Sequence, residues 1–306
     1  MRILFQMVTC SSAKNVPAFF TFGDSLVDVG NNNYLQTVAK GNFYPYGIDF
    51  GNPTGRFTNG RTVFDILRTY ILMKYSYISL ANELGFKNFT PPYLAPTTVG
   101  ETCFSRVSIM LPVRPEFPTP LGDRINFETQ VSYHGRTAAA IMSRIGIPAA
   151  QKLLRRAIYG IAIGSNDIMF RETSPKPMSD KAFLDLLISR LKLGLRTLYN
   201  LNPRKFIVGN AGPGGCIPWE KDLHFLPGGT CARVVNKMAR MYNNKLKRLL
   251  VELNKDLKGA NFVYADIYQI LTDLTENYVS YGIFLTLYFE GMKLQHCSLI
   301  YHEINN

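Results

Sequence analysis

The segment Phe19-Phe20-Thr21-Phe22-Gly23-Asp24-Ser25-Leu26 decides the fold of this chain. Its aromatic and β-branched residues favour a buried strand, and Gly23 permits a tight backbone where that strand ends. Ser25 would then open the next element, where a nucleophilic serine is well presented. Ser25 to Asp28 also fits a loose capping box, so a helix N-cap is the alternative interpretation. A nucleophile at this position would need a base to activate it and donors for an oxyanion.

Further apolar runs alternate with helical periodicity along the chain. We expect strands at residues 18–22, 158–163, 205–208 and 261–264, and helices at 137–145, 180–198 and 231–257. This alternation predicts a parallel sheet covered on both faces. Three of the strands end in small or polar residues, at 23–25, 164–167 and 209–212. Ligands bind beyond the carboxyl ends of such strands, so these segments predict the site.

Composition restricts the classes of partner. The chain has 306 residues, of which 46% are hydrophobic, and this is enough for one large α/β domain. A net charge of +12 suggests nucleic acid, anionic polysaccharide or a membrane surface. The basic residues are scattered and no recognition motif accompanies them, so we expect no nucleic-acid partner. We also expect no integral membrane segment and no cofactor, because no long apolar run, metal-ligand spacing or phosphate-binding loop occurs.

The N-terminus and the cysteines bear on the cellular compartment. Residues 1–14 contain Arg2, an apolar stretch and small residues, which indicates a degraded or truncated signal peptide; a frayed N-terminal arm is the alternative. Of five cysteines, Cys216 and Cys231 flank a loop rich in Gly and Pro. A disulfide between them would contribute ~3 kcal/mol and would fit an oxidising compartment. Two buried thiols are the alternative.

Several motifs together carry a family resemblance. The first is Phe22-Gly23-Asp24-Ser25-Leu26-Val27-Asp28-Val29-Gly30-Asn31-Asn32-Asn33, followed by Gly55-Arg56-Phe57-Thr58-Asn59-Gly60-Arg61. Gly164-Ser165-Asn166-Asp167 and the segment from Gly209 to Pro218 complete the set. With these motifs the chain, to about residue 282, resembles the plant GDSL esterase/lipase family of the SGNH hydrolase superfamily.

The resemblance implies a fold, an activity and site residues. It implies a three-layer α/β/α fold with a flavodoxin-like parallel sheet across residues 15–282, incomplete at the C-terminus. It also implies secretion and hydrolysis of lipid or other acyl esters by a monomer. Ser25 would be the nucleophile and would give a backbone N–H to the oxyanion, while Asn166 would add a side-chain donor.

The chain departs from the family pattern in three stretches. Residues 68–81 look like an insertion, and the glycine-bearing second block is not recognisable within residues 100–121. Back-translating residues 106–116 and reading from the third base of each codon permits Gly-Val-Asn-Tyr-Ala-Ser-Gly-Ala-Ala-Gly-Ile, a typical second block, so we interpret this stretch as frame-shifted. Residues 283–306 form a non-homologous tail.

No catalytic Asp–His pair is identifiable. Neither His296 nor His302 has an aspartate three residues before it, and His134 and His224 match no catalytic block. Losing one triad member costs about 10⁴-fold in rate, so we expect an ester hydrolase that is impaired or inactive. The alternative is a catalytically dead remnant, or a non-catalytic protein that binds acyl or polysaccharide ligands.

Overall fold

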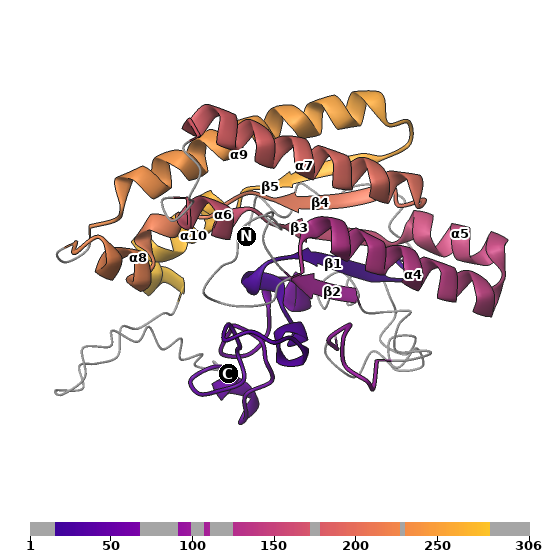
Figure 1. Ribbon diagram of the computed structural model, residues 1–306, viewed down its shortest axis with the longest axis horizontal. Helices are drawn as coiled ribbons and strands as arrows, with labels where there is room; N and C mark the ends of the chain where they lie inside the picture. The colour runs from indigo at the N-terminus through magenta and orange to yellow at the C-terminus, as the bar shows by residue number, and fades with distance from the viewer. Residues whose placement is uncertain are drawn as a thin grey trace.

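A sheet of five parallel strands forms the centre of the molecule (Figure 1). The computed structural model describes residues 16–67, 91–98, 107–110, 125–171, 178–226 and 230–281. The strands are β1 (Phe19–Gly23), β2 (Val107–Met110), β3 (Ile158–Ala162), β4 (Lys205–Gly209) and β5 (Asn261–Ala265). Their order is β2-β1-β3-β4-β5, which is the flavodoxin-like arrangement.

Helices and short 3₁₀ segments connect the strands. The helices are α4 (Phe127–Ile145), α5 (Ile147–Arg156), α6 (Ser165–Met169), α7 (Asp180–Asn200), α8 (Pro218–Leu223), α9 (Arg233–Asp256) and α10 (Ile267–Glu276). The 3₁₀ segments are η1 (Ser25–Val27), η2 (Asn31–Tyr34), η3 (Ile48–Phe50), η5 (Gly214–Cys216) and η6 (Tyr278–Tyr281). Residues 63–67 are also helical.

Three long helices form a layer on one face of the sheet. Helix α7 contacts both α4 and α9, and Figure 1 shows α7 and α9 running side by side above β4 and β5. Phe22 of the sheet, Leu191 of α7 and Leu246 of α9 are buried in one core cluster. Side-chain caps at Asn126 and Ser179 satisfy backbone N–H groups where α4 and α7 begin. Capping and apolar burial together place this layer.

The opposite face is covered by shorter elements. The ring of Phe64, in helical residues 63–67, lies 5.9 Å from that of Phe19, and it fills the space beside Gly160, where a Cβ would clash with it. Ile267, the first residue of α10, packs against Gly209 on this same face. The sheet therefore lies between two helical layers, which confirms the expected three-layer α/β/α fold.

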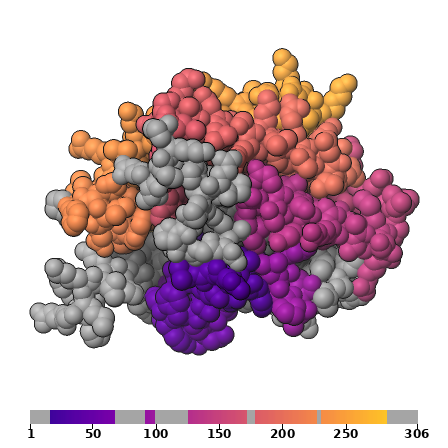
Figure 2. Space-filling view, in the orientation of Figure 1, coloured from indigo at the N-terminus to yellow at the C-terminus, as the bar shows by residue number. Residues whose placement is uncertain are grey.

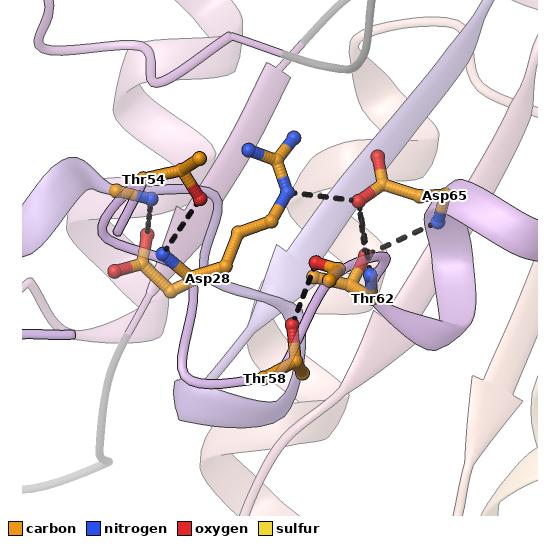
Figure 3. A network of polar contacts seen from close by, with 8 residues as sticks. Asp28, Thr54, Thr58, Thr62 and Asp65 are labelled. Carbon is orange, nitrogen blue, oxygen red and sulfur yellow. Dashed lines mark hydrogen bonds and ion pairs between the residues drawn. The ribbon is translucent and has the colours of Figure 1, made fainter. Parts of the chain in front are cut away.

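A long irregular region follows β1 and is held by buried polar groups. Figure 2 shows the N-terminal residues, in indigo, as a compact mass beside the helical layers. Asp28 accepts backbone N–H groups from Gly30 and Asn31 at 3.1 and 2.8 Å. Asp65 accepts from Arg56 Nε and from the backbone N–H and hydroxyl of Thr62, each at 3.0 Å, in the network of Figure 3. Carboxylates thus replace the hydrogen bonds that regular structure would supply.

The four expected strands and three expected helices are present, with shifts at their ends. Helix α4 begins at Phe127 rather than at residue 137, and α7 and α9 lie within two residues of expectation. Strand β2 was not predicted, because residues 107–110 lie within residues 100–121, a stretch with neither strand nor helix periodicity. Helices α5, α6, α8 and α10 were not predicted either. Residues 68–81, 1–14 and 283–306 lie outside the described residues.

Candidate active site

Ser25 lies in a tight turn directly after β1. The turn is tied to β3, since the Asp24 backbone N–H donates to the Ala162 carbonyl at 3.2 Å. The Asp24 carboxylate accepts the N–H of Leu26 at 3.3 Å, so Asp24, not Ser25, caps the short η1 segment. A Cβ at Gly23 would overlap the Ala162 carbonyl oxygen, which explains the glycine. Ser25 itself is half-buried, and its hydroxyl is not used as the cap.

Asn166 lies in the first turn of helix α6, which follows the neighbouring strand β3. Gly23 pairs with Ala162 in the sheet, so the turns carrying Ser25 and Asn166 leave adjacent strands at the same edge. Gly164 has a φ of 105°, in the left-handed region, and α6 begins directly after it. The Tyr242 hydroxyl donates to the Ile163 carbonyl at 3.0 Å and packs against Gly164. Helix α9 therefore holds the segment that leads into Asn166.

The third segment predicted to contribute to the site, residues 209–212, lies at the end of β4, at the same edge of the sheet. Asn210 donates to the Tyr264 hydroxyl at 2.6 Å and to Asp266 at 2.8 Å, and accepts the N–H of Tyr268 at 2.8 Å. Asn243 of α9 completes this attachment, because its amide bonds both the N–H and the carbonyl of Ala211 at 3.0 and 2.9 Å. The three segments beyond the strands are thus brought together as expected.

A disulfide joins Cys216 and Cys231, whose Cα atoms lie 4.4 Å apart. It closes a loop around α8, just before α9 begins. Asn236 supports the bond from α9: its Oδ1 accepts the N–H of Gly215 at 2.9 Å, and its Nδ2 lies 3.3 Å from Cys216 Sγ. The loop is therefore fixed both covalently and by the helix.

Burial alters the charge of the carboxyl group next to Ser25. Desolvation, with a smaller contribution from repulsion by the nearby Asp167, raises the pKa of Asp24 to about 7, and the Leu26 N–H opposes the shift. Within the described residues, Asp24 Oδ2 is buried without a hydrogen-bond partner. Burial also raises the pKa of Asp28. Near neutral pH the Asp24 carboxyl is therefore close to half-protonated.

Neither of the two histidines in the described part of the chain is hydrogen-bonded to Ser25. His134 is fully buried in α4 against Phe20 and Tyr159, with ring centroids 4.9 and 5.3 Å away. Burial lowers the pKa of His134 to about 3, so it is neutral. His224 Nε2 lies 3.3 Å from the buried Glu220 carboxylate. Among the described residues, no hydrogen bond joins either histidine to Ser25. His296 and His302 lie outside them.

Two helix side chains that hold the segments leading to Ser25 and Asn166 were not predicted from the sequence: Gln130 of α4 and Tyr242 of α9. One signal was available. Gln130 lies on the apolar face of its helix between Phe127 and Val131, all three of which are buried. A polar residue on such a face is buried and must be hydrogen-bonded, although the pattern does not name its partner.

A small cavity lies between α6 and the start of α9. It has a volume of about 240 Å³ and is mostly apolar, with one residue of each charge at its edge; its walls are Ile168, Met169, Arg171, Asp180, Val234, Val235 and Met238. The described residues contain neither a cluster of three metal-ligating side chains nor a helix long and apolar enough to cross a membrane.

Comparison with known proteins gives one consistent result. The family model described as GDSL-like Lipase/Acylhydrolase matches residues 19–284. The GDSL esterase/lipase At4g16230 of Arabidopsis thaliana is 42% identical over 310 residues, which cover 98% of this chain and 79% of that protein. At3g50400 of the same plant is 37% identical, covering 90% and 75%. GDSL esterase/lipase 7, also from this plant, is 38% identical, covering 87% and 73%.

Proposed function

The chain belongs to the GDSL-like lipase/acylhydrolase family, and on that basis we propose that Ser25 attacks an acyl carbonyl while Asn166 donates to the oxyanion. Family membership makes the protein an ester hydrolase of the GDSL type. The observation that carries the residue assignment is the pairing of Gly23 with Ala162, which places the two turns on adjacent strands.

The proposed chemistry is acyl transfer through the serine. Ser25 Oγ bonds to the carbonyl carbon as its hydroxyl proton passes to water, and the carbonyl electron pair moves to the oxygen. The Asn166 amide and the Ser25 backbone N–H donate to that oxygen. When the carbonyl re-forms, the ester C–O bond breaks, and the departing alkoxide takes a proton from water to become the alcohol. Water then hydrolyses the acyl-enzyme and releases the acid. We expect weak turnover, because no histidine of the described residues is hydrogen-bonded to Ser25.

Hydrolysis of p-nitrophenyl butyrate tests this proposal. Ser25→Ala should remove the enzyme-dependent rate, and Asn166→Ala should lower kcat by about 10²–10³-fold, the usual cost of losing one oxyanion donor. Ser143→Ala is the matched control, because Ser143 is an exposed serine of α4 that bonds only within its own helix. A Ser25→Ala rate equal to that of the unsubstituted chain would refute the assignment.

We also propose secretion, with lipid or other acyl esters as substrates. Support comes from the Cys216–Cys231 bond, since disulfides persist in oxidising compartments. Expression in plant cells, followed by mass spectrometry of the medium and the cells, would show where the chain accumulates and whether its disulfide has formed. Accumulation of the chain within the cells with both thiols reduced would contradict secretion.

A further inference from the structure

Gln130 of α4 is bonded to the residue in which β1 ends. Its Oε1 accepts the backbone N–H of Gly23 at 3.0 Å, and its Nε2 donates to the carbonyl of the same residue, also at 3.0 Å. Nε2 gives a second hydrogen bond to the Ile125 carbonyl at 3.2 Å. The side chain is fully buried, so these bonds are shielded from water.

These bonds lie on the side of β1 that faces β2. In a parallel sheet, successive residues of a strand bond alternately to its two neighbours. The Asp24 N–H bonds to Ala162 of β3, so the groups of Gly23 face the opposite side, toward β2. Strand β2 ends at Met110, the partner of Gly23. Within the described residues, the amide of Gln130 therefore bonds both backbone polar groups of Gly23 on this side of β1.

We propose that Gln130 is a positioning residue for the nucleophile turn. By fixing both polar groups of Gly23, it sets the direction in which the chain enters Asp24 and Ser25. The hydroxyl and N–H of Ser25 then keep their orientation toward an ester bound beside Asn166. This inference rests on the proposed function of Ser25. Gln130 contacts no reacting atom and acts through Gly23.

Matched variants distinguish a positioning role of Gln130 from a contribution to the stability of the fold. Gln130→Met keeps the length of the side chain and removes its hydrogen bonds. Val131→Ala is the matched stability control, since Val131 is the adjacent buried residue of α4. Gln151→Met repeats the substitution at an exposed glutamine of α5. Each variant is assayed well below its own melting temperature.

We expect Gln130→Met to lower kcat by about 10- to 100-fold with KM changed less than about twofold, because the chemistry is misaligned while ester binding is retained. Val131→Ala and Gln151→Met should keep kcat. Gln130→Glu supplies a rescue test, because a neutral carboxyl can accept from the Gly23 N–H and donate to its carbonyl. Its kcat relative to that of the unsubstituted chain should rise as the pH falls.

Amide hydrogen exchange tests the positioning role of Gln130 without depending on turnover. In Gln130→Met, the amides of residues 22–26 should exchange at least about tenfold faster, whereas Val131→Ala should leave them unchanged. If Ser25→Ala shows that no turnover depends on Ser25, the proposed function fails. The exchange measurement alone then tests whether Gln130 fixes the turn. Unchanged exchange in Gln130→Met, or an equal loss of kcat in Val131→Ala, would overturn the positioning role.

Discussion

Helix α9 and the irregular region between residues 28 and 65 both have buried interiors, but their buried side chains differ in kind. In α9 most are apolar: Val235, Met238, Ala239, Leu246, Leu249, Leu250 and Leu253. In the loop region many are polar or charged: Asp28, Asn31, Asn32, Arg56, Thr62 and Asp65. A helix satisfies its backbone internally, so its side chains are free to be apolar. An irregular chain must satisfy its buried backbone with side chains.

The largest expected effect comes from the ion pair of the loop region. Arg56 Nε lies 3.0 Å from Asp65 Oδ2, and both side chains are buried. Arg56→Met removes the cation beside the buried Asp65 carboxylate, so we expect the free energy of unfolding to fall by about 3–5 kcal/mol. Urea unfolding measures this loss.

The control for that variant is an exposed ion pair of α7. Lys181 Nζ lies 3.1 Å from Asp185 Oδ2 on the helix surface. Lys181→Met should leave the urea midpoint nearly unchanged, because exposed pairs are screened by water. If both variants shifted the midpoint equally, the buried network would have no special part in holding the loops.

Removal of apolar bulk from α9 should have the next largest effect. Leu246 is fully buried, whereas Val251 of the same helix is 72% exposed. Leu246→Ala should cost about 3 kcal/mol by creating a cavity. Val251→Ala provides the exposed counterpart, and calorimetry of both variants should show a lowered melting temperature for Leu246→Ala alone. Similar losses would mean that α9 is not held by its apolar face.

A smaller effect is expected at Asp24, between the two regions, and it depends on pH. The pKa of Asp24 is raised to about 7 in the folded protein, so the folded state binds the proton more tightly than the unfolded state. Its destabilising contribution is absent below the unfolded pKa and grows as the pH rises toward 7. From about pH 5 to about pH 7, this group should lower the free energy of unfolding by about 2 kcal/mol.

Asp24→Asn isolates that contribution, since the amide oxygen can still accept the Leu26 N–H but does not ionise. Chemical unfolding at several pH values should give a flatter profile for the variant, with greater relative stability near pH 7. Parallel profiles for the two proteins would show that Asp24 does not titrate in this range.

The elements that sequence predicts here are those with a local signal. The apolar run at residues 18–22 ends in a glycine and a serine, and these fix β1 and the position of the turn after it. The bond between Gly23 and Gln130 joins residues 107 positions apart, so no local pattern contains it. Strand β2 likewise depends on pairing with β1, because residues 107–110 have no periodicity of their own. Long-range pairing therefore accounts for why strand β2 and the bond between Gly23 and Gln130 were not predicted.

Helix α9 contacts the segments after β3 and β4 through Tyr242 and Asn243 and the disulfide loop through Asn236. A helix of 24 residues is about 36 Å long and stiff along its axis. We expect thermal displacement of such a rod to carry all three attachments in the same direction. The distance between Asn166 and the segment after β4 should therefore change little during this motion, because the same helix contacts both segments.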